Sequence, residues 1–265
     1  MKTLYFECNM GAAGDMLMAA LSELIPDADA FTARMNALGL PGVRVQRQRA
    51  EKCGIAGTHM AVTVDGAGEH SHDVHDHDHH HDHHHDHDHD HDHHHDHDHG
   101  HHHHASLADI GGIIDGLDVP GAVKDHAKAV YGLIAGAEAA AHGRPVDQIH
   151  FHEVGTLDAV ADVVGVCLLM HEIAPEQVVV SPIHVGSGQV RCAHGVLPVP
   201  APATARILEG APIYGGSVKG ELCTPTGAAL LVHFATSFGD MPAMTLSKTG
   251  YGMGAKDFER ANCVR

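Results

Sequence analysis

The first 64 residues alternate between apolar and polar positions in a way that predicts strands and helices in turn. Thr3–Glu7 is expected to be a buried strand that runs through a glycine-rich turn into a helix, and Asp27–Leu38 predicts a second helix. Val43–Lys52 and Ile55–Val64 alternate with a period of two residues on either side of a Cys-Gly pair, which is typical of a β-hairpin.

The second half of the chain continues this alternation. The expected helices run from a cap at Ser106 to Leu117, from Pro120 to Gly143, from Thr156 or Asp158 to Ile173, from Ala203 to Leu208 and from Gly227 to Ala235. The expected strands are Ile149–Glu153, Val178–Ile183 and Thr245–Gly250, and Gly186–Gly195 is expected to be a loop. Interleaved strands and helices favour an α/β (α+β mixed) class, with a mixed sheet flanked by helices.

An insertion between these halves changes the picture. Residues 70–104 contain 22 of the chain's 31 histidines and 10 aspartates, but a single valine and no Leu, Ile or aromatic residue. Such a segment cannot bury enough apolar surface to offset its chain entropy, so we expect a disordered metal-collecting loop between an α/β segment (1–69) and the rest of that domain (105–265). Its candidate ligands are His77, His79, His83, His87, His91, His95 and His99. The alternative is a solvated polar insertion without a metal.

The charge and composition exclude several classes of protein. The formal net charge is −18, of which the insertion supplies 10 negative charges, and a chain without a basic patch is not expected to bind nucleic acid. No apolar run is long enough to span a membrane and no signal peptide is recognisable, which predicts a cytoplasmic protein. The six cysteines form no CxxC pair, which argues against a zinc ribbon or a disulfide framework.

The strongest candidate for chemistry lies after the long central helix. His150 and His152 point the same way in an extended segment, while Asp158 and Asp162 share one face of the following helix. Two imidazoles beside two carboxylates suit a divalent metal or an acid/base site. For each residue alone, a histidine in the core or an acid favoured by the helix dipole remains an equal alternative.

Three further segments contain candidate residues. Gly186 and Gly188 could let backbone N–H groups approach a phosphate, and His194 lies on the same loop beside Cys192, with which it could form a soft metal pair. The other candidates precede helices and are Glu221, Thr224 and Asp15. For these three residues, capping of the helix is the competing interpretation.

Taken in order, the segments resemble one known family. MKTLYFECNMGAAGDM, the His-rich insertion, IHFHEVGTLDAVADVVG, GSGQVRCAHGVLPVPAPAT, ELCTPTGAALL and GYGMGAKDFERANCVR resemble the LarC family of nickel insertion proteins, which serve the lactate racemase cofactor pathway. The resemblance covers essentially the whole chain, with Glu7 and Ala261 standing where the family usually has Asp and Pro. It implies a nickel insertase (a cyclometallase of the lyase class) that converts pyridinium-3,5-bisthiocarboxylic acid mononucleotide into the nickel pincer nucleotide.

The resemblance also implies partners and roles. CTP hydrolysis with Mg²⁺ or Mn²⁺ is expected from a C-terminal part that follows Arg265 in family members, some of which make it through a frameshift. We further expect a homo-oligomer and contact with the lactate racemase apoprotein. Forming a nickel–carbon bond requires a base that removes a ring proton, for which His152, Glu153 and His194 are the candidates. A nickel storage or delivery protein and a metal-dependent hydrolase are the alternatives.

Overall fold

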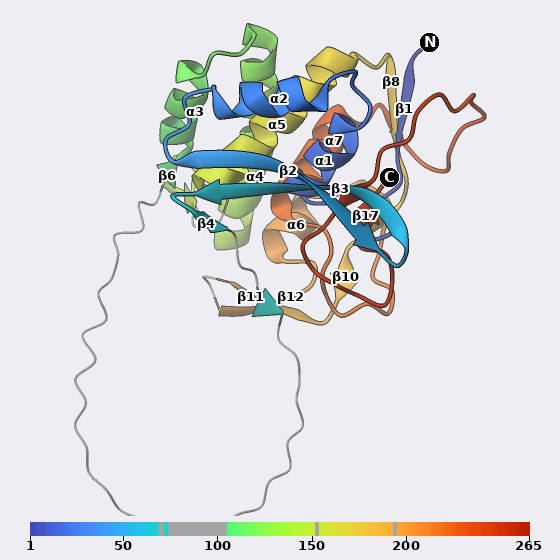
Figure 1. The fold of residues 1–265 in the computed structure, drawn as a ribbon. Coiled ribbons are helices and arrows are strands. Elements are labelled where there is room, and N and C mark those ends of the chain that lie inside the picture. The colour runs from blue at the N-terminus through green and yellow to red at the C-terminus, as the bar shows by residue number, and fades with distance from the viewer. Residues whose placement is uncertain (69–71, 74–104, 152–153, 193–194) are drawn as a thin grey trace, which may run out of the picture.

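The computed structural model describes residues 1–68, 72–73, 105–151, 154–192 and 195–265, and its elements are labelled in Figure 1. In this part of the chain the α-helices are α1 (Gly14–Ser22), α2 (Ala28–Asn36), α3 (Leu107–Gly116), α4 (Gly121–His142), α5 (Leu157–Ile173), α6 (Pro202–Ile207) and α7 (Pro225–Phe234). None of these helices is long and apolar enough to cross a membrane. The predicted disorder of the His-rich insertion concerns residues that lie, apart from 72–73, outside the described ranges.

The largest sheet is mixed and has the order β17-β16-β3-β2, with β4 paired to β3. Its members are β2 (Val43–Lys52), β3 (Ile55–Val64), β4 (Ala67–Gly68), β16 (Gly252–Met253) and β17 (Cys263–Val264). β2 and β3 pair antiparallel over their whole length, from Val43↔Val64 to Lys52↔Ile55, as the alternation predicted. β16 runs parallel to β3 and antiparallel to β17, so the end of the chain joins a sheet begun near its start.

A second sheet is fully parallel. β8 (Gln177–Val180) lies between β1 (Thr3–Phe6) and β15 (Ser237–Phe238), and it pairs with both. The remaining sheets of the described chain are short. They are β5 (His72–Asp73) with β11 (Gln189–Cys192) and β12 (Gly195–Pro198), β6 (Ala105–Ser106) with β7 (His150–Phe151), β9 (Ile183–His184) with β13 (Ile213–Tyr214), and β10 (Gly186–Ser187) with β14 (Gly220–Glu221).

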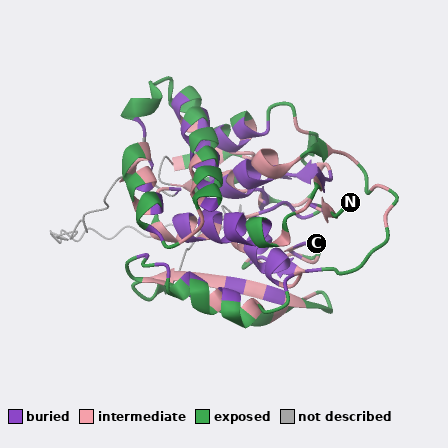
Figure 2. Ribbon diagram, turned by 90° about the horizontal axis from the view of Figure 1, so that it is seen from above, coloured by how far each residue is buried: buried purple, intermediate pink, exposed green. Residues whose placement is uncertain are grey.

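The helices form a layer beside the mixed sheet (Figure 2). α1 is almost entirely buried because it packs against α5 on one side and against β3 and β16 on the other. The α1–α5 contact is close, since a Cβ on Gly165 would lie 2.4 Å from the Met18 sulfur. α4 covers α5, α6 and α7. The sequence prediction of an α/β (α+β mixed) class with helices flanking a mixed sheet is therefore confirmed.

Most predicted elements are present, and one capping prediction holds in detail. The Ser106 hydroxyl accepts a hydrogen bond from the Asp109 backbone N–H at 3.2 Å, and Asp109 Oδ2 accepts from the Ser106 N–H at 2.9 Å. This reciprocal pair satisfies donors that the first turn of α3 would otherwise leave open.

Three predicted segments were wrong. Gly186–Gly195 is not a plain loop, because Gln189–Cys192 forms a hairpin with the strand that begins at Gly195. Val178–Ile183 is not one strand, because the sheet pairing of β8 ends before Ser181-Pro182, where proline has no N–H to donate. Thr245–Gly250 is not a strand: it has no partner in the described sheets, and Leu246 is 63% exposed.

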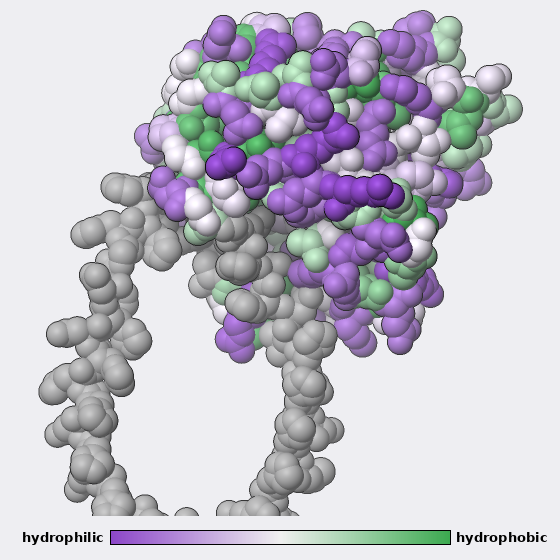
Figure 3. Space-filling model, viewed as in Figure 1, coloured by the Kyte–Doolittle hydropathy of each residue, from purple (hydrophilic) through white to green (hydrophobic). Residues whose placement is uncertain are grey.

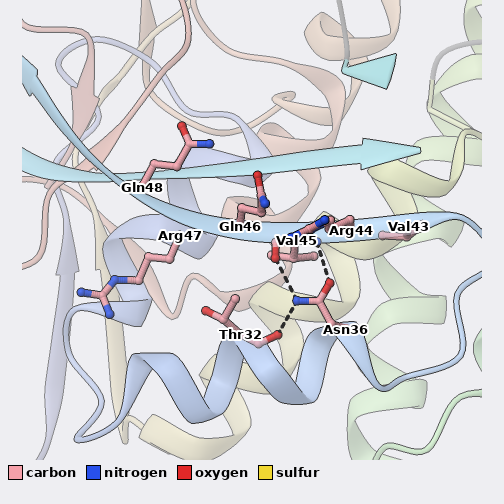
Figure 4. A pocket seen from close by; sticks show the side chains of 8 residues that line it. All are labelled: Thr32, Asn36, Val43, Arg44, Val45, Gln46, Arg47 and Gln48. Atoms are coloured by element: carbon pink, nitrogen blue, oxygen red, sulfur yellow. Dashed lines mark hydrogen bonds between the residues drawn. The ribbon is translucent and has the colours of Figure 1, made fainter. Parts of the chain in front are cut away.

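The surface around the edge strand β2 is polar. Figure 3 shows hydrophilic side chains gathered over β2, where Arg44, Arg47 and Arg49 are exposed. β2 is also an edge strand, and Asn36 covers part of that edge from α2 (Figure 4). Its amide accepts a hydrogen bond from the Val45 N–H at 2.9 Å and donates one to the Val45 C=O at 2.8 Å. A side chain here replaces the missing neighbouring strand.

Candidate functional site

The starts of α1 and α7 lie side by side. The Ala12 N–H donates to the carbonyl oxygen of Leu222 at 3.0 Å, and the Thr224 N–H donates to the carbonyl oxygen of Ala12 at 3.0 Å. Two segments that the sequence singled out separately, the glycine turn after β1 and the Glu-Leu-Cys-Thr-Pro-Thr-Gly segment, are thus joined. Two helix N-termini with their partial positive charges meet at this junction.

Two glycines make this junction possible. Gly11 has φ +77°, and a Cβ there would lie 1.9 Å from the Leu222 carbonyl oxygen. A Cβ on Gly227 would lie 2.2 Å from the Ala12 carbonyl oxygen. Close backbone packing therefore explains both glycines, with no need for a ligand at either position.

Asp162 approaches the same junction from α5. A Cβ placed on Gly14 would lie 2.8 Å from Asp162 Oδ2, so the carboxylate lies against the first turn of α1. The N-cap of that helix, Ala13, offers no side-chain hydrogen bond. Asp162 can thus complement the helix dipole, and Asp158 lies four residues earlier on the same helix, as the sequence predicted.

A residue that the sequence reasoning missed faces these carboxylates. Tyr131 on α4 is completely buried, and within the described chain its hydroxyl has no hydrogen-bond partner. Burial, followed by the nearby charges of Asp162 and Asp158, raises the pKa of the phenol well above its usual range. The sequence feature that could have revealed Tyr131 is a single polar aromatic residue on the buried face of an alanine-rich helix.

Asp15 is the other acid at the start of α1. Its Oδ2 lies 4.0 Å from Nδ1 of His59, which is also 3.0 Å from the Met253 carbonyl oxygen. Burial raises the pKa of the Asp15 carboxyl, and the facing imidazole partly offsets that increase. The direction of this shift is the one that the predicted catalytic role of Asp15 requires. His59 was not predicted.

The structure brings only some of the predicted phosphate-binding residues together. Gly186 pairs directly with Glu221 across β10 and β14, so these two candidates are neighbours. Thr224 is the N-cap of α7, and its hydroxyl accepts a hydrogen bond from the Gly227 N–H at 3.2 Å. The capping interpretation therefore holds for Thr224. Gly188 lies beyond the pair, next to the Lys219 side chain.

Several candidates lie where the structure gives no side-chain description. His152, Glu153, His194 and the insertion candidates (His77, His79, His83, His87, His91, His95 and His99) are outside the described residues. The backbone of His150 pairs with Ser106 in β6–β7, but its side chain is not described. Among the described residues, no three His, Cys, Asp or Glu side chains are grouped closely enough to hold a metal ion. The predicted sharing of one metal by His150, His152, Asp158 and Asp162 therefore stays a prediction.

The cysteines at the junction are poor metal ligands as they stand. Cys8 and Cys223 are completely buried, and neither forms a disulfide. Burial raises the pKa of the Cys8 thiol to about 12 and also raises that of Cys223. Because the thiolate is the form that binds metals, neutral thiols at these positions favour a packing role.

The groove between α2 and β2 contains none of the candidates. It is lined by Thr32, Asn36 and residues 43–48 (Figure 4). The groove is open and lies beside an edge strand. Because none of the candidate residues lines it, we place the candidate site at the α1–α7 junction, where the candidate acids lie.

Comparison with known proteins gives one consistent result. A family described as nickel insertion protein matches residues 4–265. A protein of Desulfitobacterium hafniense, "pyridinium-3,5-bisthiocarboxylic acid mononucleotide nickel insertion protein", is 37% identical over the whole chain, and a protein of the same name from Staphylococcus saprophyticus is 34% identical over 99% of it. The chain spans 58% of the length of each relative. No solved structure matches the chain significantly.

Proposed function

Because the chain belongs to the nickel insertion protein family, we propose that it inserts nickel into pyridinium-3,5-bisthiocarboxylic acid mononucleotide, the compound named in its relatives. The match over residues 4–265 is the observation that carries this proposal. The complete reaction, including CTP with Mg²⁺ or Mn²⁺, is assigned to a longer protein, since the relatives continue well beyond the matched length.

Nickel is the cargo of this reaction, and the chain offers it two kinds of ligand. The insertion supplies many imidazoles for exchangeable capture, and nickel(II) accepts imidazole and carboxylate readily. Asp158 and Asp162, with His150 and His152, would receive the ion at the folded site. Capture by imidazole competes with protons, so loading weakens in mild acid.

The substrate is anionic, and the α1–α7 junction suits an anion. Its phosphate would lie against helix N-termini and the backbone of Gly186 and Gly188, with Glu221 and Thr224 at the rim. Bond formation between nickel and the ring carbon releases a ring proton to a base. Glu153 and the two imidazoles of His152 and His194 are proposed for that step, together with Asp15, the acid in the first turn of α1.

The test uses the complete two-part protein. We expect Asp162→Asn and Asp158→Asn to reduce the yield of nickel-containing nucleotide, measured by mass spectrometry, by at least about tenfold. Asp115→Asn, at an exposed ion pair with Lys128, is the matched control. Full activity in both carboxamide variants would show that neither carboxylate takes part in the reaction.

Nickel storage without catalysis is the second candidate, because the insertion alone could serve it. Removing residues 70–104 separates the two functions. An insertase supplied with excess nickel should keep forming product without the insertion, whereas a storage protein should lose most of its bound nickel in equilibrium dialysis and have no product to form.

A further inference from the structure

Tyr131 on α4 combines complete burial with a hydroxyl that the fold does not use. The side chain is buried, and its hydroxyl has no hydrogen-bond partner in the described chain. Burying a hydroxyl without a partner opposes folding, and a phenylalanine would fill the same space without that cost. Packing of the ring therefore does not explain why this position carries a phenol.

The two carboxylates of the proposed nickel site lie near this phenol. α4 packs against α5, the helix that carries Asp158 and Asp162 (Figure 1). Burial, and then the charges of Asp162 and Asp158, raise the pKa of the phenol, so both acids are close enough to act on it. A phenol can donate one hydrogen bond and a carboxylate can only accept, which makes the two groups natural partners.

The ring of Tyr131 also contacts the segment that carries the predicted imidazole ligands. Its centroid lies 6.0 Å from that of Phe151, with the two planes 60° apart. Phe151 is buried too, and in the sequence it stands between His150 and His152. The turn before α5 packs closely on the same residue, since a Cβ on Gly155 would lie 2.5 Å from the Phe151 Cβ. Tyr131 therefore links both halves of the predicted site.

The exposure of these groups separates their roles. Asp158 and Asp162 are partly exposed, so an ion can reach them from solvent. Tyr131 is completely buried and cannot meet that ion first. Carboxylates that bind metals are themselves oriented by hydrogen bonds from neighbouring groups, and loss of such a group weakens metal binding by about 10- to 100-fold.

We propose that Tyr131 is a positioning residue, whose hydroxyl donates a hydrogen bond to the Asp158–Asp162 carboxylate pair when a divalent ion is bound there. The inference rests on the proposed function, which assigns nickel to these carboxylates. A hydrogen bond made only with the ion present raises the affinity for the ion and adds nothing to the stability of the protein without it. That separation of stability from metal affinity is what the experiments measure.

Nickel-linked stability in the full chain is the first test. Urea unfolding at pH 7.5 is measured with and without NiCl₂ for the parent, Tyr131→Phe and Thr204→Val. Thr204 is the matched control, because its hydroxyl on α6 is likewise buried without a partner in the described chain. Every variant carries the same insertion, so nickel bound there cancels. Tyr131→Phe should bind nickel about tenfold more weakly, which lowers its stabilisation by nickel by about 1.4 kcal/mol relative to Thr204→Val.

Asp162→Asn separates this inference from the proposed site. We expect it to remove the stabilisation by nickel. If it does so while Tyr131→Phe and Thr204→Val are stabilised equally, the role of Tyr131 is overturned and the carboxylate site stands. If Asp162→Asn keeps the stabilisation, or if the parent gains none, both the inference and the carboxylate site are overturned. A Tyr131→Phe variant that is less stable than the parent without nickel would show a purely structural hydroxyl.

Product formation in the complete two-part protein is the second test. Tyr131→Phe should raise the nickel concentration for half-maximal product formation by about tenfold, with little change in the rate at saturating nickel. Thr204→Val should change neither value. A lower saturating rate with an unchanged nickel dependence contradicts the positioning role. Inactivity of the unsubstituted two-part protein would instead contradict the proposed function and leave the nickel-linked stability result standing.

Discussion

The carboxylate of Asp162 fills the space beside the α-carbon of Gly14. A Cβ built on Gly14 would lie 2.7 Å from Asp162 Cβ and 2.8 Å from its Oδ2. The first residue of α1 must therefore lack a side chain for α5 to bring its acid to that helix end. The glycine preserves a contact between two segments that are nearly 150 residues apart in the sequence.

Gly14→Ala should destabilise the protein. The added methyl group meets side-chain and carboxylate atoms of Asp162 at less than van der Waals distance, and overpacking of this kind costs about 1–3 kcal/mol. Urea unfolding followed by circular dichroism measures the change. Gly136→Ala is the control, because that exposed position of α4 has open space around it and should become more stable by up to about 1 kcal/mol. Equal effects of the two substitutions would contradict the close contact.

Tyr131→Phe should leave stability unchanged or raise it. The phenol hydroxyl is buried without a hydrogen-bond partner in the described chain, and such a group costs about 1–3 kcal/mol. Removing it keeps the ring, whose centroid lies 6.0 Å from that of Phe151. The midpoint of urea unfolding is the measurement, made on the protein without added ligands.

Thr204→Val gives a matched comparison for Tyr131. Its hydroxyl is also buried and has no hydrogen-bond partner in the described chain. If both variants are stabilised, the two hydroxyls are simply unsatisfied. If Tyr131→Phe alone lowers stability by more than about 1 kcal/mol, the phenol has a partner such as a buried water, and our reading of that position is wrong.

The cysteines should differ sharply in reactivity. Cys53 is exposed, whereas Cys8, Cys167 and Cys223 are buried, and burial raises the pKa of all three buried thiols. Brief treatment with iodoacetamide at pH 8 should therefore modify Cys53 and spare the buried three, as read by peptide mass spectrometry. Labelling in guanidinium, where all six should react, is the control. Early modification of Cys8 or Cys223 would show that the α1–α7 junction opens.

The sequence was most informative where structure is local. The hairpin of β2 and β3 has the limits that the alternation predicted, and it is covered by two helices, with β3 packed against α1 and β2 against α2. The cap at Ser106 was predictable because the bonds of a capping box join residues three apart. The failure at Thr245–Gly250 has the opposite cause. A strand needs a partner that can come from anywhere in the chain, and no strand of the described sheets lies beside this segment.

The sequence predicted which acidic residues belong to the candidate site, but not how they are arranged in space. The helical spacing of Asp158 and Asp162 placed both on α5, and glycines marked the turn before α1. Their convergence with Tyr131 and with the start of α7 depends on packing between distant segments, which leaves no local pattern. The buried His184 is one example, because the carbonyl oxygens of Asn9 and Gly215 that lie against its ring come from segments that the sequence does not relate to it.

Asp15→Asn should remove a pH-dependent loss of stability. Burial holds the pKa of Asp15 in the folded protein above that of the unfolded chain, which is ~3.9 for a free Asp side chain. Between these two pKa values the folded state binds more protons than the unfolded state, so the contribution of Asp15 to stability falls as pH rises through this interval. The loss is complete above the folded pKa and absent below the unfolded one. The free energy of unfolding of Asp15→Asn, measured by urea titration from pH 3 to pH 7, should therefore increase relative to that of the parent as pH rises. The pH 3 pair is the internal control, because Asp15 is largely protonated in both states there. A difference that stays constant, or that moves in the parent's favour at pH 7, would show that the facing His59 and the helix dipole outweigh burial at this carboxyl.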